Sequence, residues 1–400
     1  MASPVASEIR RRAQGAHSFG VVYLAILLFS FHWALVAFVN SSYLYQFVSD
    51  KAVGVLYIIG SILTIIAFFF IARALRRFGN YAATLALALC EIALLLGMAF
   101  IPSVYFAVPL FLAHHAIVPL LLFNVDIFTE HLIGRNEGVT GGKRGIVLVI
   151  LSLGGAVAAL AAGFLLGSGE PRFTLLYLVS AAFMLAFFYL AFRCFRGFRD
   201  PSYADINMIV TLRHFWVTHD FRFVFLAHVL LQLFFAWMVI YVPLYLFSVI
   251  GFAWDEIGLI LFVALFAYVL FEYPIGEIAD RYIGEKEMMG VGFMILAITT
   301  IYIAFLKMPL LLPWMVTMFM TRLGAALVEA TTESYFFKHT RDADASVISF
   351  FRASRPLAYL LGALLGTLSL LYIPFNYTFV LLGILMLPGT AFAMLLKDTR

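Results

Sequence analysis

Apolar residues lie in twelve long runs that short polar segments separate. Each run is close to the ~20 residues that an α-helix needs to cross the ~30 Å hydrocarbon layer of a membrane. The predicted spans are 18–40, 53–72, 81–101, 104–127, 145–167, 173–192, 223–248, 257–275, 288–307, 311–334, 346–370 and 377–396. None shows the ten-residue alternation of a barrel strand, and helices satisfy their own backbone hydrogen bonds in lipid. The pattern predicts an all-α, polytopic membrane protein with twelve transmembrane helices.

Composition excludes a soluble protein. Hydrophobic residues make up 64% of the 400 residues and charged residues 12%, with a mean hydropathy of +1.02. Soluble domains have roughly 45–50% apolar and ~25% charged residues.

The basic residues predict how the chain is oriented. If both termini are cytoplasmic, 22 of the 26 Lys and Arg residues fall in cytoplasmic segments, three (Lys51, Arg172 and Lys307) in external segments and one, Arg322, within a span. The positive-inside rule therefore places both termini in the cytoplasm of a multi-pass protein, which we expect in the plasma membrane with its first span retained. The net charge of +4 indicates contact with membrane lipids rather than with nucleic acid.

A weak internal repeat divides the chain into two halves. An offset of 204 superposes Phe31 on Phe235, Trp33 on Trp237 and Gly54 on Gly258, and an offset of 207 superposes Asp126 on Glu333 and Gly155 on Gly362. We predict an N-terminal six-helix half (1–192), a cytoplasmic linker (193–222) and a C-terminal six-helix half (223–400). Parallel repeats of this kind are typical of transporters that bind solute near mid-bilayer and work by alternating access.

One loop resembles a family signature. Between spans eight and nine the chain reads Gly276-Glu-Ile-Ala-Asp280-Arg281-Tyr-Ile-Gly284-Glu-Lys286. With the twelve spans and their 6+6 division, this segment resembles the loop motif of the major facilitator superfamily, and the resemblance implies that family's fold and solute-transport activity. It also implies that Gly276, Asp280, Arg281 and Gly284 form a conformational loop that stabilises the outward-facing state. The first-half loop has Arg76 where Asp280 stands.

Span ten carries Arg322, Glu329 and Glu333 on one face, because spacings of seven and four keep them within a ~40° arc. Arg322 is expected roughly 15 Å deep, where an unpaired cation costs at least ~2.5 kcal/mol. We expect it to face the central cavity and meet a carboxylate, an anionic substrate or a carbonyl-lined pocket. Glu329 is the leading proton-handling candidate, because burial disfavours its ionised form and Arg322 favours it. The alternative is a purely structural ion-pair stripe.

Further polar and aromatic residues in the spans are candidates, each with a packing role as its alternative. The substrate-cavity candidates are His32, Trp33, Gln232, Trp237, Tyr241 and Arg322. The proton-coupling candidates are Glu329, Glu333, Glu272 and His114. Glu91 is a weaker candidate, because members of the family place span three at the periphery of the bundle. The adjacent His114 and His115 point about 100° apart and are not a metal pair.

The sequence contains no P-loop, nucleophile elbow or His-Glu-x-x-His motif, and Cys90 and Cys194 have no metal-ligand spacing. We therefore expect no catalytic residue, metal or cofactor. The expected function is secondary active or facilitative transport of a small organic solute by alternating access, with proton coupling as an option. The alternatives are a membrane-embedded enzyme and a non-transporting receptor or partner-binding bundle.

Overall fold

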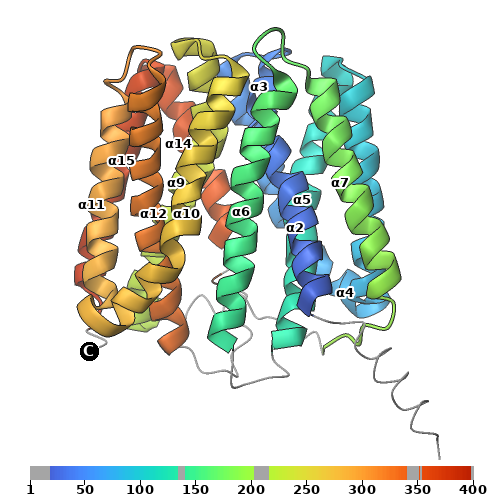
Figure 1. Ribbon diagram of the computed structural model, residues 1–400, viewed down its shortest axis with the longest axis horizontal. Coiled ribbons are helices and arrows are strands. Elements are labelled where there is room, and N and C mark those ends of the chain that lie inside the picture. The colour runs from blue at the N-terminus through green and yellow to red at the C-terminus, as the bar shows by residue number, and fades with distance from the viewer. Residues whose placement is uncertain (1–18, 134–139, 202–215, 340–350, 352–353, 398–400) are drawn as a thin grey trace, which may run out of the picture.

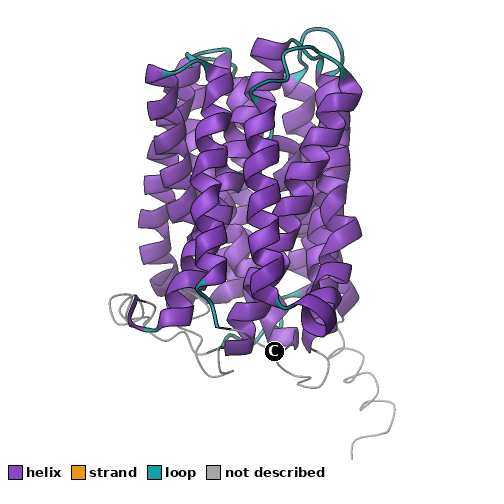
Figure 2. Ribbon diagram, turned by 90° about the vertical axis from the view of Figure 1, so that its left-hand side faces the viewer, coloured by secondary structure: helices purple, strands orange, loops and turns teal. Residues whose placement is uncertain are grey.

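A computed structural model describes residues 19–133, 140–201, 216–339, 351 and 354–397. This part of the chain is helical, with loops between the helices and no strand (Figure 2). The helices run side by side along one common direction (Figure 1). The all-α prediction is confirmed.

The helices follow the predicted spans closely. They are α2 (Phe19–Ala37), α3 (Asn40–Tyr45), α4 (Asp50–Phe100), α5 (Val104–Ile133), α6 (Thr140–Leu166), α7 (Phe173–Cys194), α9 (His219–Tyr245), η3 (Leu246–Ile250), α10 (Trp254–Ile278), η4 (Ala279–Ile283), α11 (Glu285–Ile303), α12 (Leu311–His339), α14 (Ser354–Tyr372) and α15 (Phe375–Met394). The end of the segment between predicted spans ten and eleven, most of the first residues of span eleven (346–350, 352–353) and residues 398–400 lie outside the described residues.

Helix α4 accounts for two of the predicted spans. Eleven segments of the described chain are long and apolar enough to cross a membrane, and α4 is one of them although it has 51 residues. At 1.5 Å per residue α4 would be about 77 Å long, more than twice the hydrocarbon thickness. Gly79 interrupts it with φ 78° and ψ 161°. The two parts of α4 are therefore separate spans, in agreement with the twelve expected.

Helix pairs α6–α10 and α4–α14, with a smaller contact of α3 on α9, join the early and the late part of the chain. In Figure 1 the blue-to-green helices up to α7 lie on one side and the yellow-to-red helices from α9 onward on the other. Helix α6 packs against α10, and α14 packs against α4. The middle of the predicted linker, 202–215, lies outside the described residues. Helix α7 ends at Cys194 and α9 begins at His219, both within the predicted bounds of the linker.

A pair of glycine contacts obeys the internal repeat. A Cβ added to Gly258 of α10 would lie 2.7 Å from the Cα of Gly163 in α6. One added to Gly54 of α4 would lie 1.9 Å from Oγ1 of Thr367 in α14. Adding 204 to positions 54 and 163 gives 258 and 367, so the offset found in the sequence maps one contact onto the other. A Cβ at Gly258 would meet the backbone of α6, and one at Gly54 would meet the Thr367 side chain, so both positions need glycine.

The two signature loops share a backbone conformation. Gly79 has φ 78° and ψ 161°, and Gly284 has φ 102° and ψ 149°. Essentially only glycine adopts this region. The first loop also has a carboxylate at the start of its next helix, because the Asn80 amide donates a 2.7 Å hydrogen bond to Oδ1 of Asp200. Asp200 comes from the segment after α7 and supplies an acid at a loop that has Arg76 at the position of Asp280.

The side chains of Asp280 and Arg281 and the surroundings of Gly276 lie outside the described residues. Their backbone forms the π-turn η4 and the end of α10, directly before Gly284. The conformational role that the resemblance gives this loop stays a prediction.

Replacing Asp200 by Ala should destabilise the fold by about 0.5–2 kcal/mol, the usual loss when a helix N-terminus loses its side-chain acceptor. Asp200→Asn keeps an acceptor oxygen and should retain most of the stability. Thermal unfolding of the detergent-purified protein measures both variants. Glu170→Ala, at an exposed acid in the α6–α7 loop, is the control; an Asp200→Ala midpoint equal to that of the control would contradict the cap.

Candidate functional site

Polar side chains within the spans form two separate groups. We call His32, Glu91 and His114, with the hydrogen-bond partners Asn40, Tyr177 and Ser180, the histidine cluster. We call Glu272, Glu329 and Glu333 the carboxylate group. The proton-coupling candidates from the sequence are therefore divided between two places rather than gathered in one.

Glu91 is the centre of the histidine cluster. It is fully buried in the second part of α4, and its Oε1 lies 2.6 Å from Nδ1 of His114 in α5. The same oxygen lies 3.5 Å from Nε2 of His32 in α2. Glu91 is thus not peripheral, as expected from the resemblance, but joins two buried histidines.

The partners of the histidines fix where their protons lie. Tyr177 in α7 donates to Oδ1 of Asn40 at 2.9 Å, which leaves the Asn40 amide nitrogen to donate to Nε2 of His114 at 3.2 Å. A neutral His114 therefore carries its hydrogen on Nδ1 and donates it to Glu91.

The same accounting applies to His32. Ser180 donates its hydroxyl hydrogen to the backbone carbonyl of His32 at 3.1 Å, and its oxygen lies 2.8 Å from Nδ1 of His32. Nδ1 is then the donor, and Nε2 of the neutral ring faces the Glu91 carboxylate as a second acceptor without a hydrogen between them. Nε2 of His32 and Oε2 of Glu91 both lack a hydrogen-bond partner. The cluster has room for one further proton.

Arg322 on α12 is buried without an ion pair. Its side chain is 2% exposed, its guanidinium carbon lies 5.4 Å from the centre of the Phe234 ring, and its Nη1 has no hydrogen-bond partner. It also interacts electrostatically with Tyr268 and Tyr359. The ion-pair stripe that α12 suggested is therefore wrong: although the helix places the three residues on one side, Arg322 does not pair with Glu329 or Glu333.

Tyr359 connects this region to the early helices. It lies on α14, and its ring centre is 6.1 Å from that of His115 on α5. His115 also packs edge-on against Tyr57 of α4, with ring centres 5.3 Å apart. The adjacent residues His114 and His115 thus have different surroundings, as their angular separation predicts. Tyr359, which interacts with Arg322, contacts His115 of an early helix, so only this one residue separates Arg322 from the boundary between the early and late helices.

The carboxylate group lies at the same boundary. Ser152 of α6 donates a 3.2 Å hydrogen bond to Oε2 of Glu272 on α10. Glu272 interacts electrostatically with Glu329 and Glu333 of α12. The cation that acts on Glu329 is Arg355 of α14, not Arg322.

The aromatic candidates for the substrate cavity do not line one common surface. Trp33 is 36% exposed, whereas its repeat partner Trp237 is fully buried with Nε1 unpaired. Tyr241 donates to the backbone oxygen of Ala363 at 3.1 Å and lies against Thr367, so it holds α9 to α14. Gln232 is buried, and its Nε2 has no partner.

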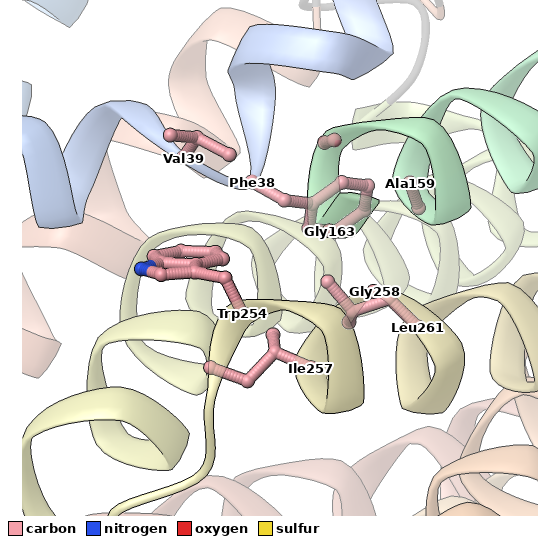
Figure 3. A pocket seen from close by; sticks show the side chains of 9 residues that line it. Phe38, Val39, Ala159, Gly163, Trp254, Ile257, Gly258 and Leu261 are labelled. Carbon is pink, nitrogen blue, oxygen red and sulfur yellow. The ribbon is translucent and has the colours of Figure 1, made fainter. Parts of the chain in front are cut away.

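A narrow apolar crevice lies between the turn after α2 and the helices α6 and α10 (Figure 3). It has no room for a water molecule. Its walls are Phe38, Val39, Ala159, Ala162, Gly163, Trp254, Ile257, Gly258 and Leu261. Figure 3 shows the Trp254 indole below Val39 and the two glycines facing each other. We interpret the crevice as a tight seal rather than as a binding site.

Several residues of these groups had no signal in the sequence. Asn40, Tyr177, Ser180, Ser152 and Tyr359 are ordinary span residues by pattern, and only three-dimensional contact gives them a role. Glu91 had a usable signal, because an ionisable residue inside a span is a functional candidate by default. In the described part of the chain no group of three His, Cys, Asp or Glu side chains could hold a metal ion.

The fold and part of the sequence match known proteins. The family model described as Major Facilitator Superfamily matches residues 224–400. A POT family transporter, PepTSo, has a similar structure with a TM-score of 0.74 at 12% identity, over 94% of this chain and 97% of that chain. A mutant of the nucleoside transporter NupG has a TM-score of 0.74 at 14% identity, over 95% of this chain and all of that chain. No curated protein matches the sequence.

The two structural similarities show the fold and cover nearly the whole chain, while the family match comes from the sequence itself. The match to the Major Facilitator Superfamily model covers the later helices, from α9 onward, and the two solved transporters are similar to the whole chain in fold.

Proposed function

We propose that this protein transports a small organic solute across the membrane by alternating access and that the transport is coupled to protons. The observation that carries the coupling is the position of the carboxylate group: Glu272 of α10 is bonded to Ser152 of α6, across the contact that joins the early and late helices. A group at that contact changes its surroundings when the two sets of helices move apart.

Electrostatics supports a proton as the coupled ion. Glu272 and Glu329 interact with each other inside a low-dielectric wall, and Arg355 is the cation that acts on Glu329. Because two nearby carboxylates repel, a proton taken up by either one relieves the repulsion. A movement that separates Ser152 from Glu272, or Arg355 from Glu329, alters how tightly the pair holds that proton.

The glycine contacts support alternating access. Gly163 meets Gly258 and Gly54 meets Thr367 at the end of the bundle where α6 leads into α7, the upper end in Figure 1. With the orientation from the basic residues, this end is external. The structure then corresponds to a state closed toward the outside, and the apolar crevice is the external seal.

The histidine cluster is a second candidate for the coupling site. The facing acceptors His32 Nε2 and Glu91 Oε1, 3.5 Å apart, leave a place for one proton between them. The ionisable residues of this cluster lie on α2, α4 and α5, and their partners come from early helices, so movement of one half against the other reaches them less directly. The carboxylate group is therefore our first choice.

The same orientation places both termini in the cytoplasm and the basic segments against anionic lipid. We propose the plasma membrane as the location of the protein. Counterflow by the protein in liposomes against a panel of solutes tests transport itself. A non-transporting receptor would show no counterflow with any solute.

Glu329→Gln should abolish accumulation of the solute on an imposed pH gradient and should preserve exchange of labelled for unlabelled solute, because exchange does not require release of the proton. Reconstituted liposomes measure both. Glu91→Gln tests the histidine cluster in the same assay, and Glu170→Gln, at an exposed loop acid, is the control. Accumulation at the wild-type level in Glu329→Gln would remove Glu329 from the coupling, and its loss in Glu91→Gln alone would assign the proton to the histidine cluster.

Gly163→Ala should open the external seal, because its Cβ would lie 2.6 Å from the Trp254 carbonyl oxygen and 2.8 Å from the Gly258 Cα. Both are backbone atoms, so α6 and α10 must separate. Cysteine at position 38, on a background without Cys90 and Cys194, should then react faster with an impermeant thiol reagent added outside. Gly155→Ala is the matched control on the same helix, since nothing lies within 4 Å of its Cβ. Equal rates in the two variants would contradict a seal at this contact.

Single cysteines at Ser49 and Ser168 should be labelled by an impermeant reagent from outside intact cells, whereas one at Gly197 should be labelled only after permeabilisation. All three positions are exposed in the structure. The expectation follows from the positive-inside rule. The reverse pattern of labelling would invert the orientation.

A further inference from the structure

Arg322 is a full positive charge that the protein itself does not neutralise. It is 2% exposed, makes no ion pair or hydrogen bond in the described part of the chain, and leaves Nη1 unpartnered. A charge within the hydrocarbon region is costly, and charged residues in spans pair with one another or face a solute pathway. Since Arg322 pairs with no other charged residue of the described chain, we expect it to face a solute pathway.

The surroundings of Arg322 are aromatic. Phe234 of α9 lies under the guanidinium with 5.4 Å to the ring centre, and Tyr268 of α10 and Tyr359 of α14 interact with it electrostatically. Ring faces attract a cation but satisfy none of its N–H donors. The guanidinium is thus positioned over the Phe234 ring while its Nη1 hydrogen-bonding capacity is left unused.

We propose that Arg322 binds the anionic group of the transported solute, and that the solute is an organic monocarboxylate with an aromatic or apolar body. This inference rests on the proposed transport function and adds the class of substrate. A carboxylate accepts two parallel N–H bonds from the planar guanidinium, which supplies the hydrogen bonds that are missing.

The charge and the position of Arg322 narrow the class of substrate further. One arginine neutralises one negative charge, which favours a monocarboxylate over a doubly charged phosphate ester. The rings beside Arg322 suit an apolar body better than a sugar or a peptide backbone. Tyr359 contacts His115 of α5, with ring centres 6.1 Å apart, so a solute held here lies beside both sets of helices. That is where alternating access requires a substrate.

Binding can be tested on the purified protein without transport. Thermal unfolding is followed in detergent with benzoate, phenylpyruvate and octanoate, and with benzamide, benzylamine and phenyl phosphate as neutral, cationic and phosphate counterparts. At least one carboxylate should raise the unfolding midpoint in a saturable way, because a ligand that binds only the folded state stabilises it. Benzamide and benzylamine should have no such effect.

Variants assign the effect to Arg322. Arg322→Gln should weaken carboxylate binding by ~10- to 100-fold, the loss expected for a charge-assisted hydrogen-bond pair. Arg322→Lys should recover part of the affinity, because it keeps the charge and loses the planar fork. Lys307→Gln removes an exposed cation and is the matched control. If Arg322→Gln fails to fold, Arg322→Lys and the wild-type comparison of benzoate with benzamide still decide.

Counterflow in liposomes separates this inference from the proposed function. Counterflow of a carboxylate that is lost in Arg322→Gln supports both. Counterflow of neutral or cationic solutes alone, or a carboxylate effect unchanged in Arg322→Gln, overturns the anion site and leaves transport standing. Stabilisation by phenyl phosphate in place of every carboxylate assigns the arginine to phosphate esters and overturns the substrate class. Absence of counterflow with the whole panel, together with carboxylate binding that depends on Arg322, overturns transport and retains the anion site.

Discussion

The hydrocarbon core of a membrane offers no hydrogen bonds, and the whole structure follows from that constraint. Backbone groups satisfy one another within helices, and polar side chains inside the bundle must find partners in the protein. The histidine cluster obeys this almost completely: a chain of contacts leads from Tyr177 through Asn40, His114 and Glu91 to His32. Arg322 is a buried cation that does not obey it, since among the described residues it has neither an ion pair nor a partner for Nη1, and this contrast indicates that it needs an external partner.

Packing between the early and late helices depends on close backbone approach. Lipid tails are as apolar as leucine, so helices in a membrane gain little from the hydrophobic effect and associate through contact between small residues. The meeting of Gly163 with Gly258, and of Gly54 with Thr367, gives α6–α10 and α4–α14 such contacts. At Gly163 and Gly258 the two backbones meet directly, whereas Gly54 meets the side chain of Thr367.

Much of this architecture was predictable from local patterns, because a span needs only length and apolarity. The twelve spans and the glycines of both loops belong to that part. The contacts of α12 were not predictable: helical spacing put Arg322 and Glu329 on one side but could not show that Arg355, from α14, acts on Glu329. Likewise Asp200 reaches Asn80 from 120 positions away. The expectation that Glu91 lies at the periphery was wrong for the same reason: its partners, His114 and His32, come from other helices.

Anion binding at Arg322 and proton binding at Glu329 are compatible because they are distinct in space. Seven residues on one helix separate the two positions by about 10 Å along the axis, too far for a direct ion pair. Tyr268 interacts electrostatically with both Arg322 and Glu329, and also with Glu272. A bound carboxylate adds a negative charge beside this tyrosine and so increases the repulsion on Glu272 and Glu329. Uptake of a proton there becomes more favourable, which is the sign that cotransport of an anion with a proton requires.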